Sequence, residues 1–249
     1  MHLLCTLLLS CLLPCLLLSP LYAVEPLVLA TADRPPLSTE DHQGFSDRVI
    51  REACRRLGIE VQIVAVSSAR SLSNVERGVD DGNFLRIKGF DKKYPHLVRV
   101  PEKIIDVQFV IFSKDSQLKT PNWESLRPYH VGYVRGWLIA EQNIKDVKEI
   151  TVVENRTSLF KVLESDRIEL AFAELYGGYY LMKTLNLPHL SIAHPPLATM
   201  EMFLYLNNKH EKLVPKLTAV LKEMKRDGTY NAIFNQTLTP YLPPHLIRK

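Results

Sequence analysis

The chain has 249 residues, of which 31 are Lys or Arg and 27 are Asp or Glu, so its formal net charge at pH 7 is +4. The two signs are interspersed, which indicates a soluble surface and argues against a dedicated nucleic-acid-binding protein, since such proteins concentrate their basic residues. This length is enough for one large domain or for two lobes of about 100 residues each.

Residues 1–23 predict a secretory signal peptide. They contain no Lys, Arg, Asp or Glu, are rich in Leu, and are interrupted by Pro14 and Pro20. The apolar stretch is short for a membrane span, and Ala23 is a small residue at the expected cleavage point. A retained N-terminal anchor is the alternative.

Cysteine usage supports export to a bacterial periplasm. Once residues 1–23 are removed, Cys54 is the single cysteine that remains, so the mature chain has no internal disulfide. An exported chain without disulfides suits a periplasm better than a eukaryotic secretory route. Cys54 lies on the apolar face of a predicted helix, which indicates a buried, unreactive thiol.

Strand and helix patterns alternate through the first hundred residues. Short apolar runs indicate strands, and apolar residues at helical spacing indicate helices. This order predicts a parallel sheet with right-handed crossovers. The predicted elements are a strand over Leu27–Asp33, a helix from Ser46 to Gly58, a strand over Ile59–Val66, a helix from Ser67 to about Gly78, and a strand over Gly82–Ile87.

The segment Ile104–Asp115 predicts a strand that crosses from one lobe to another. Its apolar residues occupy both faces, as in a strand covered on both sides. A second alternation begins after it, and the run Met200–Asn207 can carry the chain back. The second set comprises strands over His130–Arg135, Lys148–Glu154 and Ile168–Ala173, with helices over Trp137–Ile144, after Asn155 and after Gly178.

The chain is expected to end with one helix and an irregular tail. From Glu211 the residues Leu213, Leu217, Val220, Leu221 and Met224 share one helical face, and Gly228 ends the pattern. The Pro-rich tail over residues 239–249 predicts no regular structure.

Several motifs in order resemble a known family. They are Gly44-Phe45 at a helix start, Asp81-Gly82 before a strand, Val131-Gly132 followed by Gly136, Asp166 to Glu169 before a strand ending in Glu174, and Leu213 to Tyr230. The set resembles the bacterial extracellular solute-binding proteins of family 3, the polar-amino-acid type that serves ABC importers.

The resemblance implies an α/β, two-lobed type II periplasmic-binding-protein fold. Each lobe would be a mostly parallel sheet flanked by helices, and two crossing strands would join the lobes. The expected boundaries are residues 24–112 and 203–249 for the first lobe and 113–202 for the second.

The candidate ligand-binding residues lie at the carboxyl ends of predicted strands, where open α/β sheets bind ligands. Arg86 or Arg70 has the guanidinium that a carboxylate requires, and Glu174 has the acid that an ammonium group requires. The resemblance likewise implies that an acid at the position of Glu174 binds an amino group. The other candidates are Asp33, Ser68, Trp137, Asn155 and Arg156.

Two departures from the family pattern bear on the ligand. The region Lys88–Lys93 lacks the Arg that members binding amino acids carry there, and Trp137 stands where they have a hydroxyl residue. Either Arg86 and Arg70 replace the missing guanidinium, or the ligand is not an ordinary α-amino acid.

Five of the candidates also have a purely structural alternative. Arg70 and Arg86 can form ion pairs with Asp80, Asp81 or Glu76. Glu174 can cap the following helix, Trp137 can cover the lobe, and Asp33 can serve in a turn.

Three functions remain open. The first is a periplasmic protein that binds a small, amino-acid-like metabolite for an ABC importer, and the second is a sensor that presents its ligand to a membrane receptor. The third is a periplasmic enzyme similar to cyclohexadienyl dehydratases, with Glu174 as general acid. The sequence shows no metal-ligand spacing, nucleophile motif or cofactor loop, so no metal, cofactor or nucleic acid is expected, and the protein is expected to be a monomer.

Overall fold

The structure is a computed structural model that describes residues 25–32 and 34–246. The predicted signal peptide, over residues 1–23, and the candidate Asp33 lie outside the described residues. The backbone of Ser68 is described, but its side chain is not. None of the described helices is long and apolar enough to cross a membrane.

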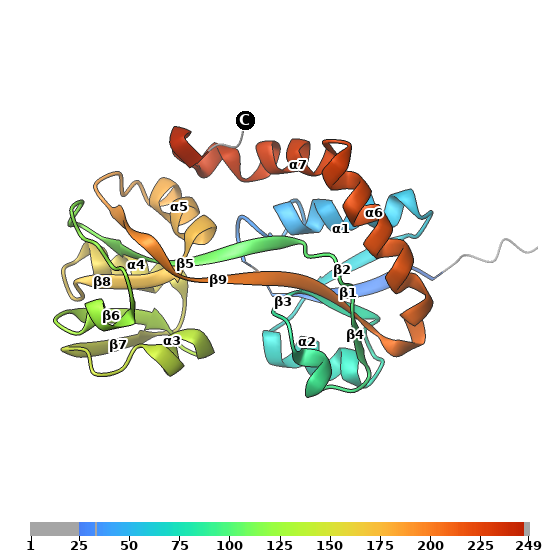
Figure 1. Ribbon diagram of the computed structural model, residues 1–249, viewed down its shortest axis with the longest axis horizontal. Helices are drawn as coiled ribbons and strands as arrows, with labels where there is room; N and C mark the ends of the chain where they lie inside the picture. Colours follow the sequence, from blue (N-terminus) through green and yellow to red (C-terminus); the bar gives the residue numbers. More distant parts are fainter. Residues whose placement is uncertain (1–24, 33, 247–249) are drawn as a thin grey trace, which may run out of the picture.

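The first half of the chain forms a parallel sheet with helices, which we call lobe 1 (Figure 1). The central strand β1 pairs in parallel with both β2 and β3, which confirms the predicted alternation. The short strand β4 was not predicted, because three residues carry no periodicity. Lobe 1 contains β1 (Leu27–Thr31), α1 (Phe45–Arg56), β2 (Val61–Ala65), α2 (Ser68–Glu76), β3 (Gly82–Arg86), the 3₁₀ turn η1 (Phe90–Lys92) and β4 (Leu97–Arg99).

The middle of the chain repeats this arrangement as lobe 2. Its central strand β6 pairs in parallel with β7 and β8. Helix α5 packs closely on the crossing strand, since a Cβ on Gly178 would overlap the ring of Phe112. Lobe 2 contains the 3₁₀ turn η2 (Trp123–Leu126), β6 (His130–Val134), α3 (Leu138–Asn143), β7 (Glu149–Val153), α4 (Arg156–Glu164), β8 (Leu170–Glu174) and α5 (Leu175–Thr184).

Two long antiparallel strands, β5 (Ile105–Ser113) and β9 (Ser191–Asn207), join the lobes (Figure 1). Strand β9 pairs with β3 and β4 in lobe 1, and β5 pairs with β8 in lobe 2. The hydrogen-bonded path therefore runs β2-β1-β3-β9-β5-β8-β6-β7 through both lobes. This topology confirms the two-lobed α/β architecture.

Strand β9 begins at Ser191, well before the Met200 that the sequence predicted. Pro195 and Pro196 concealed its first half, because proline interrupts a strand pattern. The prolines lie where the register with β5 shifts, between the pairs Phe109–Ala198 and Ile111–Ala193. At such a bulge the extra residues need no ladder hydrogen bond, so proline is tolerated.

The C-terminal segment contains one helix more than predicted. The face of α6 is buried as expected at Leu217, Val220, Leu221 and Met224, but α7 follows directly after Gly228. Gly228 has φ +86°, a turn conformation that glycine adopts without strain. The segment contains η3 (Asn208–Leu213), α6 (Val214–Arg226), α7 (Thr229–Thr237), η4 (Thr239–Tyr241) and η5 (Pro244–Leu246).

The end of the C-terminal segment contacts lobe 2 as well as lobe 1. Lys183 of α5 donates a hydrogen bond to the carbonyl of Pro240 at 2.8 Å, and the rings of Tyr180 and Tyr241 lie 5.0 Å apart. Figure 1 shows α7 passing above the crossing strands toward α5. The segment is therefore more than a packing element of lobe 1.

Cys54 is fully buried in α1, and burial raises its pKa to about 12. The thiol is thus protonated and shielded at neutral pH, so the prediction of an unreactive buried cysteine is confirmed.

Arg56 connects three helices on the outer side of lobe 1. Its guanidinium lies 2.9 Å from Glu52 in α1, 3.0 Å from Glu223 in α6 and 2.6 Å from Asp227 after α6. It also donates to the hydroxyl of Thr229 in α7 at 2.7 Å. This network fixes α6 and α7 against α1.

The network predicts an acid-dependent stability. Hydrogen bonds from Arg55 and then Arg56 lower the pKa of Glu52 from its ordinary 4.5 to about 2, against the opposing effect of burial. Because the folded pKa is depressed, this stabilisation is complete above pH 4.5 and is lost as the pH falls toward 2. We expect Glu52→Gln to lower the melting temperature at pH 7 by about 2–4 °C, with the difference vanishing near pH 2.

Differential scanning calorimetry of both proteins from pH 2 to pH 7 measures this effect. Glu60→Gln is the control, because the side chain of Glu60 forms no ion pair with any described residue. A constant difference between Glu52→Gln and the parent protein at all pH values would contradict the assignment.

Candidate functional site

The carboxyl ends of the parallel strands in the two lobes face each other. Strand β9 runs from lobe 2 into lobe 1, and β3 is antiparallel to it, so β3 ends toward lobe 2. Strand β5 runs the opposite way, and β8 is antiparallel to it, so β8 ends toward lobe 1. Ligands of open α/β sheets bind beyond these strand ends, so the candidate site lies between them.

Arg86 ends β3 and Glu174 ends β8, so the two candidates occupy the facing edges. Arg86 pairs with Phe203 of β9, and Glu174 pairs with Phe109, whose partner on β9 is Ala198. Five residues of strand separate these two positions on β9, which corresponds to about 17 Å. Two long side chains and a small molecule can fill such a span.

A bulge sets the direction of Arg86. Between Asn83 and Arg86 the register of β3 with β9 shifts, and Leu85 has φ +59°, a strained value for a residue with a branched side chain. Such bulges occur beside functional sites, where they redirect a side chain. Arg86 is 5% exposed. Burial, and then the charge of nearby Arg34, lowers its pKa to about 10, so the guanidinium stays charged at neutral pH.

The three carboxylates proposed as structural partners of Arg70 and Arg86 bind other groups. Arg70 itself is exposed and forms no side-chain hydrogen bond or ion pair with the described residues, so its ion-pair alternative is wrong. Asp80 accepts from Asn74, Asp81 pairs with Lys209 and His210, and Glu76 pairs with His96.

Glu174 and Arg156 lie together and bind each other. Nη1 of Arg156 donates to Oε1 of Glu174 at 2.7 Å, and the side chains are 16% and 5% exposed for Arg156 and Glu174. The same Nη1 lies 3.1 Å from the carbonyl oxygen of Pro35, in the loop after β1. Arg156 therefore joins lobe 2 to lobe 1 at the facing edges.

Glu174 does not cap α5, so the capping alternative is wrong. It occupies the N-cap position, but its side chain forms no capping hydrogen bond. Arg156 begins α4, which places its side chain beside the end of β8.

Asn155 and Trp137 each have structural contacts. The side chain of Asn155 caps α4 by accepting from the backbone N–H of Ser158 at 2.8 Å. The ring of Trp137 packs edge-on against Phe109 and Phe172, with centroids 6.0 and 6.2 Å apart, and the residue remains partly exposed. Trp137 therefore covers the lobe and has surface left for a ligand.

Two features of the site had no clear signal in the sequence. The contact of Arg156 with Pro35 spans 121 residues, and no local pattern reports such a pair. Gly177 leaves the space that Arg156 occupies, since a Cβ there would overlap Nη1. The Gly177-Gly178 pair in a helical pattern was the one available hint, because glycine inside a helix is costly.

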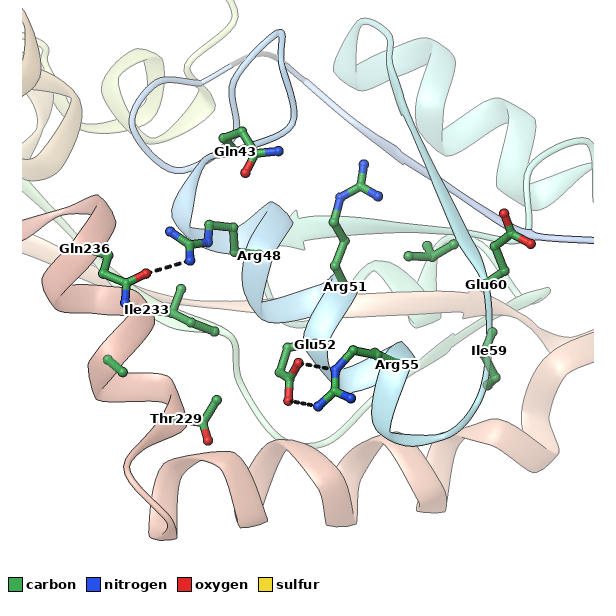
Figure 2. Close-up of a pocket in the computed structure, with 12 residues that line it drawn as sticks. Gln43, Arg48, Arg51, Glu52, Arg55, Ile59, Glu60, Thr229, Ile233 and Gln236 are labelled. Carbon is green, nitrogen blue, oxygen red and sulfur yellow. Dashed lines mark hydrogen bonds and ion pairs between the residues drawn. The ribbon is translucent and has the colours of Figure 1, made fainter.

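A separate groove of about 630 Å³ lies on the outer side of lobe 1, between α1 and α7 (Figure 2). Its polar side chains largely bind each other, with Arg48 donating to Gln236 at 2.6 Å and Arg55 to Glu52 at 2.7 Å. The groove includes Glu60, which precedes β2 and so lies at the opposite edge of the sheet from Arg86. We therefore place the candidate site at the facing edges. Within residues 25–32 and 34–246, no group of three or more His, Cys, Asp or Glu is placed to hold a metal ion.

Comparisons with known proteins agree with the fold. Residues 27–239 match the family model of bacterial extracellular solute-binding proteins, family 3. An uncharacterized protein of Shewanella oneidensis is 26% identical, over 84% of this chain and 84% of its own length.

Solved structures show the same architecture. A mutant of ArgBP from T. maritima has a TM-score of 0.68 at 21% identity, with 86% of this chain and 95% of that chain covered. A histidine kinase sensor domain with similarity to periplasmic binding proteins has a TM-score of 0.71 at 18% identity, with 86% and 96% covered. At these identities the likeness establishes the fold.

The capping role of Asn155 gives a prediction about stability. Asn155→Ala removes the acceptor for the Ser158 N–H and is expected to lower the free energy of unfolding by about 1 kcal/mol. Asn155→Ser keeps a capping oxygen and is expected to stay within about 0.5 kcal/mol of the parent protein. Urea titration followed by circular dichroism measures both, and equal stability of the Ala and Ser variants would exclude the cap.

Proposed function

Because this chain belongs to family 3 of the bacterial extracellular solute-binding proteins, we propose that it captures a small polar or charged metabolite between its lobes. The observation that carries the proposal is the pair of facing strand edges, with Arg86 on one and the Arg156–Glu174 pair on the other. Charged groups on opposite lobes can hold the two ends of one small molecule.

The proposed setting is a bacterial periplasm. Residues 1–23 would direct export and be removed, and the loaded protein would deliver its ligand to the permease of an ABC importer. ArgBP of T. maritima, whose arginine-bound form is among the similar structures, supports a small-molecule ligand.

A sensor role is the second candidate. The histidine kinase sensor domain is as similar in structure as ArgBP, so the fold also serves signalling proteins. In this role the closed protein would bind the periplasmic part of a membrane receptor. Co-purification from membranes with a permease favours transport, and co-purification with a kinase favours sensing.

Ligand binding is expected to depend on Arg86. A thermal-shift screen over amino acids, amines and small carboxylates should reveal a compound that raises the melting temperature, because a ligand that binds the folded form alone stabilises it. Arg86→Met is expected to weaken that compound by about 100-fold, the cost of leaving a charged group unpaired. Isothermal titration calorimetry measures the change.

Arg55→Met is the matched control, since Arg55 is a highly exposed arginine in the outer groove. Unchanged affinity in Arg86→Met would remove Arg86 from the site. A large loss of stability in Arg86→Met without ligand would assign it a structural role instead.

Binding is also expected to close the lobes. The two crossing strands are the natural hinge, and each lobe has its own sheet and helices, so closure should be a rigid rotation. Small-angle X-ray scattering should show a smaller radius of gyration at saturating ligand. An identical scattering curve with and without ligand would contradict hinge closure.

A further inference from the structure

The Arg156–Glu174 pair restricts which ligand the proposed site can accept. Resting on the proposed function, we propose that Arg156 is the permanent counter-ion of Glu174 and that the cleft binds a carboxylate without an α-ammonium group. An α-amino acid would be the weaker ligand.

The pair is well buried, and Arg156 is held by two contacts. Glu174 is 5% exposed at its side chain and Arg156 is 16% exposed, and one guanidinium nitrogen reaches both Oε1 of Glu174 and the carbonyl of Pro35. An incoming ammonium group would have to share Glu174 with Arg156, whose guanidinium already neutralises the carboxylate. A paired carboxylate attracts a second cation less strongly, and displacing Arg156 would break a buried ion pair, so the pair opposes binding of an amine.

The surrounding chain leaves a space fitted to the guanidinium. A Cβ on Gly177 would overlap Nη1 of Arg156 and lie 3.1 Å from both Cγ and Oε1 of Glu174. Gly177 sits in the first turn of α5, where its lack of a side chain lets Arg156 approach the carboxylate. The contact thus depends on a glycine inside a helix, where glycine is less favourable than other residues. This cost indicates that the space at Gly177 serves the Arg156–Glu174 pair.

The charges at the facing edges favour an anion. Among the described residues at the carboxyl ends of these strands, Glu174 is the one buried carboxylate, and it is already paired. Arg70 supplies an exposed guanidinium group from lobe 1. Nε and Nη2 of Arg156 form no hydrogen bond with any described residue, so they can donate to a ligand carboxylate.

Matched ligand pairs test the proposal directly. We would titrate the mature chain by calorimetry with L-glutamate and glutarate, L-arginine and 5-guanidinopentanoate, and L-phenylalanine and 3-phenylpropanoate. In any pair that binds, the form without the amine is expected to bind at least about 10-fold tighter. The reason is that the amino acid would weaken one charge-assisted contact, the one between Arg156 and Glu174. Tighter binding of the amino acid would overturn the inference and leave the proposed function standing.

Variants of the pair provide a second test. Gly177→Ala pushes the Arg156 guanidinium away from Glu174, and Arg156→Met removes it, so both should shift the preference toward the amino acid by about 10-fold or more. Gly177→Ala keeps the inference testable if Arg156→Met fails to fold. Lys114→Met is the control, because Lys114 pairs with Asp166 on lobe 2, after the end of β5 and away from the facing edges.

The outcomes separate the two proposals. An unchanged preference in Gly177→Ala and Arg156→Met would overturn the role of Arg156. A ligand found by the thermal screen outside the three pairs is compared with its own counterpart that has or lacks the α-amine. A ligand that carries an α-ammonium group contradicts the inference. Failure of every compound to bind would remove the proposed function and the inference together.

Discussion

The antiparallel pairing of β5 with β9 is the constraint on which the rest of the molecule depends. Since β3 joins one side of this ribbon in lobe 1 and β8 joins the other side in lobe 2, both parallel sheets end toward each other. If β5 and β9 had paired in parallel, the carboxyl edge of one sheet would face away from the other lobe. Arg86 and Glu174 would then not lie on facing edges.

Much of the fold was predictable because it is recorded in local periodicity. The alternation of apolar runs and helical faces predicted the strands and helices of two parallel sheets. Apolar residues on both faces of Ile104–Asp115 predicted a covered crossing strand, which the structure has as Ile105–Ser113. The first half of β9 and helix α7 were missed, because Pro195, Pro196 and Gly228 are stop signals in any short window. The structure accommodates them at a bulge and at a turn.

The site was predictable in its residue types but less so in its pairings. The rule that ligands bind at strand ends selected Glu174 and Arg156 separately, and the structure brings them together. Their contact depends on the space at Gly177 and on the carbonyl of Pro35, and neither is visible in a local pattern. The direction of Arg86 depends on the bulge at Leu85. Residue propensities do not predict a positive φ at a leucine, so no signal in the sequence indicated this bulge.

The contacts between η4 and α5 bear on how far the two halves can separate. Tyr241 lies against Tyr180, and Lys183 binds the carbonyl of Pro240, on the side of the crossing strands that α7 covers (Figure 1). The segment formed by α7 and η4 would hold the lobes together on this side of the crossing strands, while the opposite side opens. Ligands would then enter and leave on that opposite side, and the length of this segment would limit how far the lobes separate.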